Sequence, residues 1–135
     1  MSEPLWLTAE MIVAIHEAQI IEHGGAAGTR DEGMLHSAIE RARNKWAYEQ
    51  PDLPTLAAAY GFGIARNHPF VDGNKRTSLM AIYTFLGLND VEFLVPEASF
   101  AAIILSLAAG EVSEDSLTQW IRDNWPEGLS QSLDP

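Results

Sequence analysis

Apolar residues recur at intervals of three and four along most of the chain, which is the spacing of amphipathic α-helices. The first helix is predicted to run from an N-cap at Thr8 to about Glu22, where a glycine-rich break follows. Thr29 and Glu32 have the spacing of a capping box and predict the start of the second helix. The side chains expected to face inward are Met11, Ile15 and Ala18 in the first helix, and Leu35, Ala38, Ile39 and Ala42 in the second.

Two strongly apolar helices are predicted in the middle of the chain. One starts near Pro54, a residue favoured at helix starts, and ends at Asn67 or His68, because a proline follows. The next starts near Gly73 and is apolar on most sides, which is typical of a central helix. Their expected buried positions are Leu56, Ala59, Tyr60 and Gly63, and then Leu79, Ile82, Tyr83 and Leu86.

Two shorter helices are predicted to complete the fold, one opened by Pro96 and one capped by Ser113. Residues 44–53 show no clear period and are predicted to form a loop, with a small hairpin as the alternative; residues 91–95 are predicted to be extended. The chain is therefore predicted to be all-α, a single domain over residues 1–135 with about six helices around a central helix. The fold can also include a short flap hairpin at residues 44–53.

Composition narrows the class of protein. Of 135 residues, 47% are apolar and 20% charged, as in ordinary globular domains, and the absence of cysteine excludes disulfides and thiolate metal sites. Eight basic against nineteen acidic residues give a net charge of −11, which argues against binding to nucleic acid or to an anionic membrane. The sequence shows neither a signal peptide nor an apolar stretch of membrane-spanning length, so a cytoplasmic location is expected.

Two of the few cations lie at a helix start, where an anion would be needed to balance them. Lys75 and Arg76 fall in the first turn of a predicted helix, where a cation opposes the helix dipole by on the order of 0.3–1 kcal/mol. Unpaired backbone N–H groups at such a helix start bind phosphates. Gly73 has no side chain and therefore allows a phosphate to approach these N–H groups closely. The pattern therefore predicts a phosphate site formed by Gly73, Asn74, Lys75 and Arg76.

Two further residues in the same segment complete a set of groups for phosphate chemistry. Asp72 precedes the phosphate site, where a carboxylate can hold the Mg²⁺ that accompanies a nucleotide such as ATP. His68 carries an imidazole, whose usual pKa of about 6.5 suits it to accept a proton from an attacking hydroxyl. His68 is therefore the candidate general base and Asp72 the candidate metal ligand.

Each of these residues also has a simpler interpretation. A histidine beside a core helix is usually a packing or surface residue, and Asp72 can merely cap the helix. Lys75 and Arg76 can belong to a solvated face. All of these interpretations would have to hold together by coincidence, so the segment is interpreted as a nucleotide site.

The segment from His68 to Arg76, His-Pro-Phe-Val-Asp-Gly-Asn-Lys-Arg, resembles the signature of the Fic superfamily, His-x-Phe-x-Asp/Glu-x-Asn-x-Arg. AMP-transferring members usually have Gly where this chain has Lys75, and a second Arg where it has Leu79. Both departures resemble the death-on-curing (Doc) branch. The likeness covers roughly residues 5–125 and includes residues 29–39 and 109–113.

The resemblance implies a toxin of a toxin–antitoxin pair that transfers the terminal phosphate of ATP, with Mg²⁺, to elongation factor Tu and arrests translation. It implies that His68 is the base, that Asp72 holds the metal, and that Phe70 anchors the segment in the core. Transfer of AMP, as in other Fic enzymes, is the alternative enzyme. A non-catalytic nucleotide-binding module is a third hypothesis, which the complete motif argues against.

The resemblance also implies partners. The sequence contains no Ser/Thr-x-x-x-Glu-Gly/Asn self-inhibitory motif, so a separate Phd-like antitoxin is expected to inhibit the protein in trans. Residues 44–53 correspond to the flap that aligns target peptide in the family, and Trp46 and Tyr48 are its candidate contacts; simple packing on the bundle is the alternative. The remaining histidines, His16, His23 and His36, are predicted to lie on the surface or at helix ends.

Overall fold

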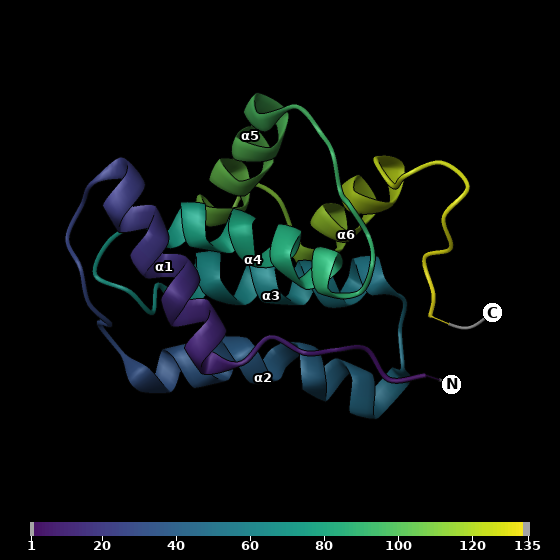
Figure 1. Ribbon diagram of the computed structural model, residues 1–135, viewed down its shortest axis with the longest axis horizontal. Coiled ribbons are helices and arrows are strands. Elements are labelled where there is room, and N and C mark those ends of the chain that lie inside the picture. Colours follow the sequence, from purple (N-terminus) through teal and green to yellow (C-terminus); the bar gives the residue numbers. More distant parts are fainter. Residues whose placement is uncertain (1, 134–135) are drawn as a thin grey trace.

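The computed structural model describes residues 2–133 as a bundle of six helices (Figure 1). Within that range the only β-pairing is an isolated bridge between Thr29 and Phe70, so the all-α prediction is confirmed. None of the helices in residues 2–133 has the length and apolarity that crossing a bilayer requires. The helices are α1 (Ala9–His23), α2 (Glu32–Glu49), α3 (Leu53–Asn67), α4 (Asn74–Leu88), α5 (Glu97–Ala108) and α6 (Glu114–Asp123).

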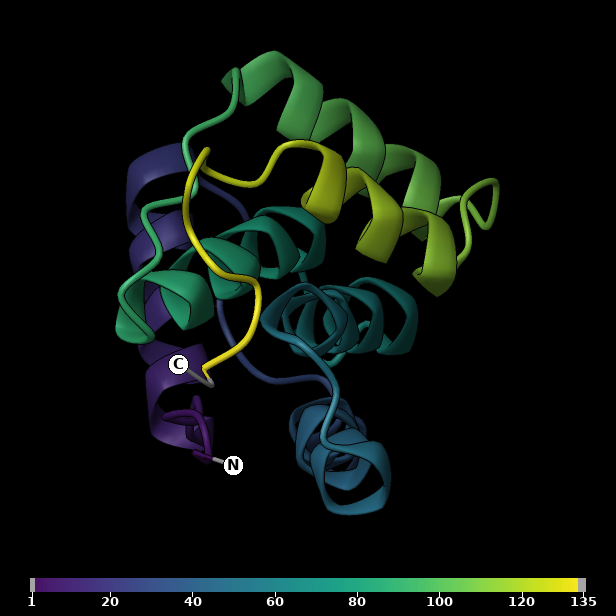
Figure 2. The same ribbon diagram turned by 90° about the vertical axis from the view of Figure 1, so that its right-hand side faces the viewer.

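The central helix is α3, which contacts α2, α4, α5 and α6 and lies in the middle of the bundle (Figure 2). The sequence pattern predicted α4 as the central helix. This prediction is wrong, because Tyr83 of α4, which was expected to be buried, is exposed. Small residues let the neighbours approach α3 closely. A Cβ atom at Gly63 would lie 2.9 Å from the Cα of Ala38 in α2, and one at Gly61 would lie 2.5 Å from Ile82 in α4.

The helix starts largely follow the predicted caps, with one exception. Thr8 and Ser113 cap α1 and α6 as expected, but α2 is capped by Asp31, whose side chain accepts a hydrogen bond from the Met34 amide at 3.0 Å. The predicted Thr29–Glu32 capping box is wrong, because Thr29 pairs with Phe70 instead. The predicted inward positions of α2 are all buried.

The predicted loop at residues 44–53 is wrong for its first half, since α2 continues to Glu49 and ends where Gln50 adopts a left-handed conformation. No hairpin forms there within the described residues. Trp46 lies on the helix and packs edge-on against Trp6, with ring centroids 6.3 Å apart. Aromatic and polar residues interrupt the apolar period here, which hid the helix from the sequence pattern.

The buried face of α1 is displaced by one position from the predicted face. Ala18 is exposed, and two polar side chains lie inside in place of the expected apolar ones. A pattern of hydrophobic residues cannot identify a face that contains buried polar groups. The buried residues of α1 are Ile12, His16 and Gln19.

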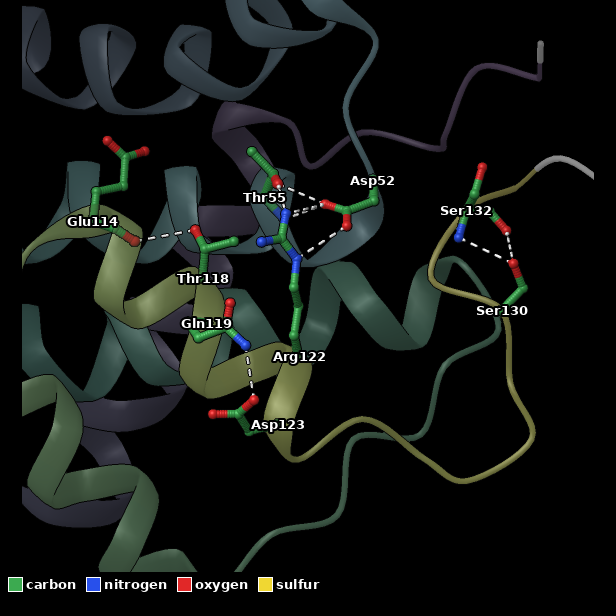
Figure 3. A network of polar contacts seen from close by, with 9 residues as sticks. All are labelled: Asp52, Thr55, Glu114, Thr118, Gln119, Arg122, Asp123, Ser130 and Ser132. Carbon is green, nitrogen blue, oxygen red and sulfur yellow. Dashed lines mark hydrogen bonds and ion pairs between the residues drawn. The ribbon is translucent and has the colours of Figure 1, made fainter.

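A polar network joins α6 to the start of α3 (Figure 3). Asp52 caps α3 by accepting a hydrogen bond from the Thr55 amide at 3.1 Å, and Arg122 of α6 donates to Asp52 through Nε at 3.1 Å and Nη2 at 3.3 Å. Burial alone would raise the pKa of the Asp52 carboxyl, but the hydrogen bonds from Arg122 and Thr55 outweigh it and lower that pKa below its usual value.

We expect Asp52→Asn to lower the free energy of unfolding at pH 7 by about 0.5–1 kcal/mol, because asparagine retains the cap but loses a partly exposed ion pair. Folding lowers the pKa of Asp52, so its charge stabilises the fold at pH values above the unfolded-state pKa of about 3.9. This stabilisation is lost as the pH falls through the folded-state pKa. Urea unfolding should therefore show the difference from wild type shrinking toward zero at acidic pH. An equal difference at neutral and acidic pH would contradict this assignment.

Candidate active site

The residues between α3 and α4 form a tight reversal, which we call the motif loop (residues 68–73). His68 follows the last turn of α3 with φ 49°, a left-handed conformation that is uncommon outside glycine, and Gly73 precedes α4 with φ 76°. The two turns bring His68 to the same side as the start of α4. His68, Asp72, Gly73, Asn74, Lys75 and Arg76 all line one hollow of about 460 Å³, together with Val71.

The motif loop is closed by Asn74, which is buried. Its Oδ1 accepts from the Phe70 amide at 3.0 Å, and its Nδ2 donates to the Phe70 carbonyl at 2.9 Å. The predicted core anchor, Phe70, is 1% exposed. The Asn74 side chain thus has a positioning role, and its predicted contact with phosphate stays a prediction that the second hydrogen of Nδ2 or the backbone N–H can serve.

The first turn of α4 is open to an anion. Side chains cap α1, α2, α3 and α6, whereas, within the described part of the chain, α4, at Gly73, and α5, at Pro96, begin without a side-chain cap. Lys75 and Arg76 are exposed, and neither forms an ion pair with any carboxylate of residues 2–133. Free amides, a positive helix end and two available cations are the features of a phosphate site.

Asp72 lies at the edge of this hollow with its carboxylate held in place. Its Oδ2 accepts from the Ala26 amide at 3.2 Å and its Oδ1 from the Gly73 amide at 2.8 Å. These two hydrogen bonds, with smaller contributions from the charges of Arg76 and His16, lower the pKa of the Asp72 carboxyl. The side chain is therefore ionised at neutral pH.

A lone carboxylate fits Mg²⁺ that arrives with a nucleotide. Among residues 2–133, no three His, Cys, Asp or Glu side chains cluster as a metal cage. Magnesium commonly binds through one or two carboxylates, with phosphate oxygens and water as its other ligands. Asp72, ionised and beside the open helix start, meets that requirement.

A glycine-rich loop (residues 24–31) clamps the motif loop, and its role was not predicted. Arg30 donates from Nε to the His68 carbonyl at 2.8 Å and from Nη2 to the Asn67 carbonyl at 3.0 Å. Its backbone amide donates to the Pro69 carbonyl at 2.7 Å. A Cβ atom at Gly25 would lie 2.7 Å from Oδ2 of Asp72, which explains the need for glycine at this close approach. The run of glycines was the available signal.

The histidines other than His68 do not all lie on the surface. His23 and His36 are exposed, but the prediction is wrong for His16, which is buried. Its ring stacks on the ring of Phe70, and its Nε2 is 2.8 Å from the carbonyl oxygen of Asp72. His16 therefore contacts the motif loop directly.

The structure does not bring the two flap candidates to this site. Trp46 and Tyr48 lie near the far end of α2, roughly 22 Å or more along the helix from its start at Asp31, at 1.5 Å per residue. The N-cap residue of α2, Asp31, adjoins the motif loop, because its backbone amide donates a hydrogen bond to the Pro69 carbonyl. Tyr48 is 89% exposed, and a contact between these side chains and a target peptide stays a prediction.

An open helix start beside an ionised aspartate and a histidine defines a candidate nucleotide-dependent transfer site. A family model described as the Fic/DOC family matches residues 6–86, which is more than half of the chain. This chain therefore belongs to the Fic/DOC family.

Two individual proteins resemble it. Protein kinase doc of Escherichia phage P1 is 36% identical over 118 residues, which cover 86% of this chain and 92% of the phage protein. Toxin Doc of Mycolicibacterium smegmatis is 43% identical over 75 residues, which cover 53% of this chain and 57% of that toxin.

Proposed function

We propose that this protein is the toxin of a toxin–antitoxin pair and transfers the terminal phosphate of ATP to a hydroxyl of a target protein. The observation that carries the proposal is the single hollow that joins His68 to the uncapped start of α4, with Asp72, Lys75 and Arg76 around it. The similarity to proteins named Protein kinase doc and Toxin Doc supports both parts of the proposal.

In the proposed reaction, His68 accepts the proton of the target hydroxyl as its oxygen attacks the γ-phosphorus of ATP. The bond from that phosphorus to the β,γ-bridging oxygen breaks, and ADP leaves with the bond's electron pair. Lys75 and Arg76 stabilise the negative charge on the phosphates, which is the main protein contribution in phosphoryl transfer. Mg²⁺, when bound at Asp72, would neutralise further phosphate charge.

The loop contacts support the proposed roles. Arg30 holds the backbone of His68, and the amides of Ala26 and Gly73 hold the Asp72 carboxylate, so the backbone that carries the base and the carboxylate of the metal ligand are restrained before any ligand binds. An apolar hollow of about 230 Å³ adjoins Lys75 and Arg76 and offers a place for the nucleoside part of ATP. Its remaining lining residues are Leu79, Ala101, Ile104 and Leu105.

Phosphate transfer is favoured over AMP transfer by Lys75 and Leu79, the two positions at which this chain departs from AMP-transferring relatives. The name of the phage protein favours the same reaction. We propose elongation factor Tu as the target protein and a Phd-like antitoxin, supplied in trans, as the inhibitor. The basis for both is membership of the family and similarity to Toxin Doc.

Induced expression in a bacterial host tests the toxin function. Wild type is expected to stop incorporation of labelled amino acids and then growth, whereas His68→Ala, expressed at the same level, is expected to do neither. His36→Ala is the matched control, because this histidine is exposed on α2 and away from the hollow. Equal arrest by wild type and His68→Ala would contradict an enzymatic toxin.

A further inference from the structure

His16 is a polar side chain buried beneath the motif loop. It is 2% exposed and lies on the face of α1 that packs toward α4. Its ring is nearly parallel to that of Phe70, with centroids 3.9 Å apart and an interplanar angle of 5°. At the edge of the same ring, Nε2 of His16 lies 2.8 Å from the backbone oxygen of Asp72. One side chain therefore contacts both the anchor of the loop and the backbone of the candidate metal ligand.

The direction of this hydrogen bond follows from the chemistry of its two atoms. A carbonyl oxygen only accepts, so Nε2 of His16 must carry the hydrogen and donate it. The bond is partly buried, so losing this donor costs free energy to the extent that water cannot replace it. His16 consequently favours one orientation of the Asp72 carbonyl over any other.

That orientation also determines where the Gly73 amide points. The Asp72 carbonyl and the Gly73 N–H belong to one planar peptide unit, so neither can rotate without the other. The Gly73 N–H donates to Oδ1 of Asp72 at 2.8 Å and thereby holds the carboxylate. A hydrogen bond from His16 at one edge of the planar peptide unit thus fixes the N–H at the opposite edge, which holds the carboxylate.

This peptide is the one in the loop that most needs such a restraint. Gly73 has φ 76°, and a peptide before a left-handed glycine can flip with little steric cost. Side chains of α1 pack closely here, since a Cβ atom at Gly73 would lie 3.2 Å from Ile20 and 3.7 Å from Nε2 of His16, but such contacts have no preferred direction for a carbonyl or an N–H group. The hydrogen bond from His16 supplies the directional constraint that packing does not.

We propose that His16 is a positioning residue, whose Nε2–H donor locks the Asp72–Gly73 peptide and so aims the Asp72 carboxylate into the hollow at the start of α4. The part of the proposal that this orientation of the Asp72 carboxylate aids the binding of Mg²⁺ and nucleotide rests on the proposed function. The lock itself is a property of this chain's own backbone and can be tested without any ligand.

Two substitutions separate the hydrogen bond from the ring stacking. His16→Phe retains an aromatic ring against Phe70 but has no donor. His16→Gln loses the ring, yet its amide nitrogen reaches about as far from Cα as Nε2 does and can donate to the Asp72 carbonyl. His16→Asn is a matched polar control, because its shorter amide does not reach that oxygen.

The first readout needs no ligand. In ¹⁵N NMR spectra, His16→Phe and His16→Asn are expected to shift the Gly73 amide resonance and to accelerate its exchange with solvent. His16→Gln is expected to leave both close to wild type. Retention of the wild-type Gly73 signal in folded His16→Phe or His16→Asn would overturn the proposed lock. A Gly73 signal in His16→Gln as altered as in His16→Asn would overturn it equally.

The second readout is calorimetric binding of the non-hydrolysable ATP analogue AMP-PNP. With Mg²⁺, affinity is expected to fall roughly 10- to 100-fold in His16→Phe or His16→Asn, as when the support of a metal ligand is removed, and about threefold or less in His16→Gln. With EDTA in place of Mg²⁺, all variants should bind alike.

The two readouts distinguish the failure of each idea. If wild type does not bind Mg²⁺ with AMP-PNP while the Gly73 signals behave as expected, the lock stands and the proposed function fails. If wild type binds and all three variants bind equally well, the positioning role is wrong and the proposed function survives. If His16→Phe does not fold, the comparison of His16→Gln with His16→Asn decides alone.

Discussion

Replacing His68 by alanine is expected to lower the rate of phosphate transfer by a factor of about 10²–10⁴, the usual contribution of a general base. His68 lines the hollow at the start of α4, and the backbone carbonyl of His68 is held by Arg30. Single-turnover transfer from ATP to the target protein measures the chemical step. Binding of AMP-PNP should change less than threefold, because the phosphates are held by other residues.

The comparison with His36→Ala makes the result specific. Both variants remove one exposed imidazole, but only His68 lines the hollow. A loss of transfer in His68→Ala that equals the loss in His36→Ala would remove His68 from the reaction. A loss of AMP-PNP binding as large as the loss of rate would make it a binding residue instead.

Asp72→Asn is expected to reduce kcat/KM at a fixed Mg²⁺ concentration by about 100-fold, because charge stabilisation by the metal is lost. Asparagine can still accept a hydrogen bond through its oxygen, so the contact with the Ala26 or Gly73 amide can persist and the fold should be retained. Titration of the rate with Mg²⁺ should show a half-saturation point shifted to higher concentration in the variant.

Asp115→Asn is the matched control for this prediction. It also removes one exposed carboxylate from near the start of a helix, here the first turn of α6, away from the hollow. Its Mg²⁺ dependence should match that of wild type. An unshifted Mg²⁺ titration in Asp72→Asn, with full activity at saturation, would show that Asp72 is not the metal ligand.

The limits of several helices could be predicted because their signals are local. Thr8 and Ser113 cap helices whatever the rest of the chain does, and a proline after His68 ends α3 within one residue of the expected position. That the candidate residues lie together was predictable for the same reason. His68 and residues 72–76 fall within nine positions, and two helix ends suffice to bring them into one hollow.

The errors arise where distant contacts decide local structure. Thr29 has the spacing of a capping residue, but its backbone pairs with Phe70, so Asp31 takes the cap. The central position of α3 depends on glycines and alanines that allow close approach, and these residues contribute little to an apolar period.

His16 and Arg30 show why part of the site was missed. Both act on the motif loop through its backbone carbonyl groups, and they do so from helix α1 and the glycine-rich loop. A side chain that bonds to a distant backbone group leaves no spacing pattern in the sequence. Only the packing of α1 against α4 brings His16 to Asp72.

The most direct test of the proposed reaction is the position of the transferred label. The protein is incubated with Mg²⁺, purified elongation factor Tu, and ATP labelled at either the α- or the γ-phosphorus. The expected result is γ-label on the target, no α-label, and neither label when His68→Ala replaces wild type. Stable α-label on the target would establish AMP transfer instead, and neither label with wild type, on this target or in a whole-cell extract, would contradict the enzymatic account.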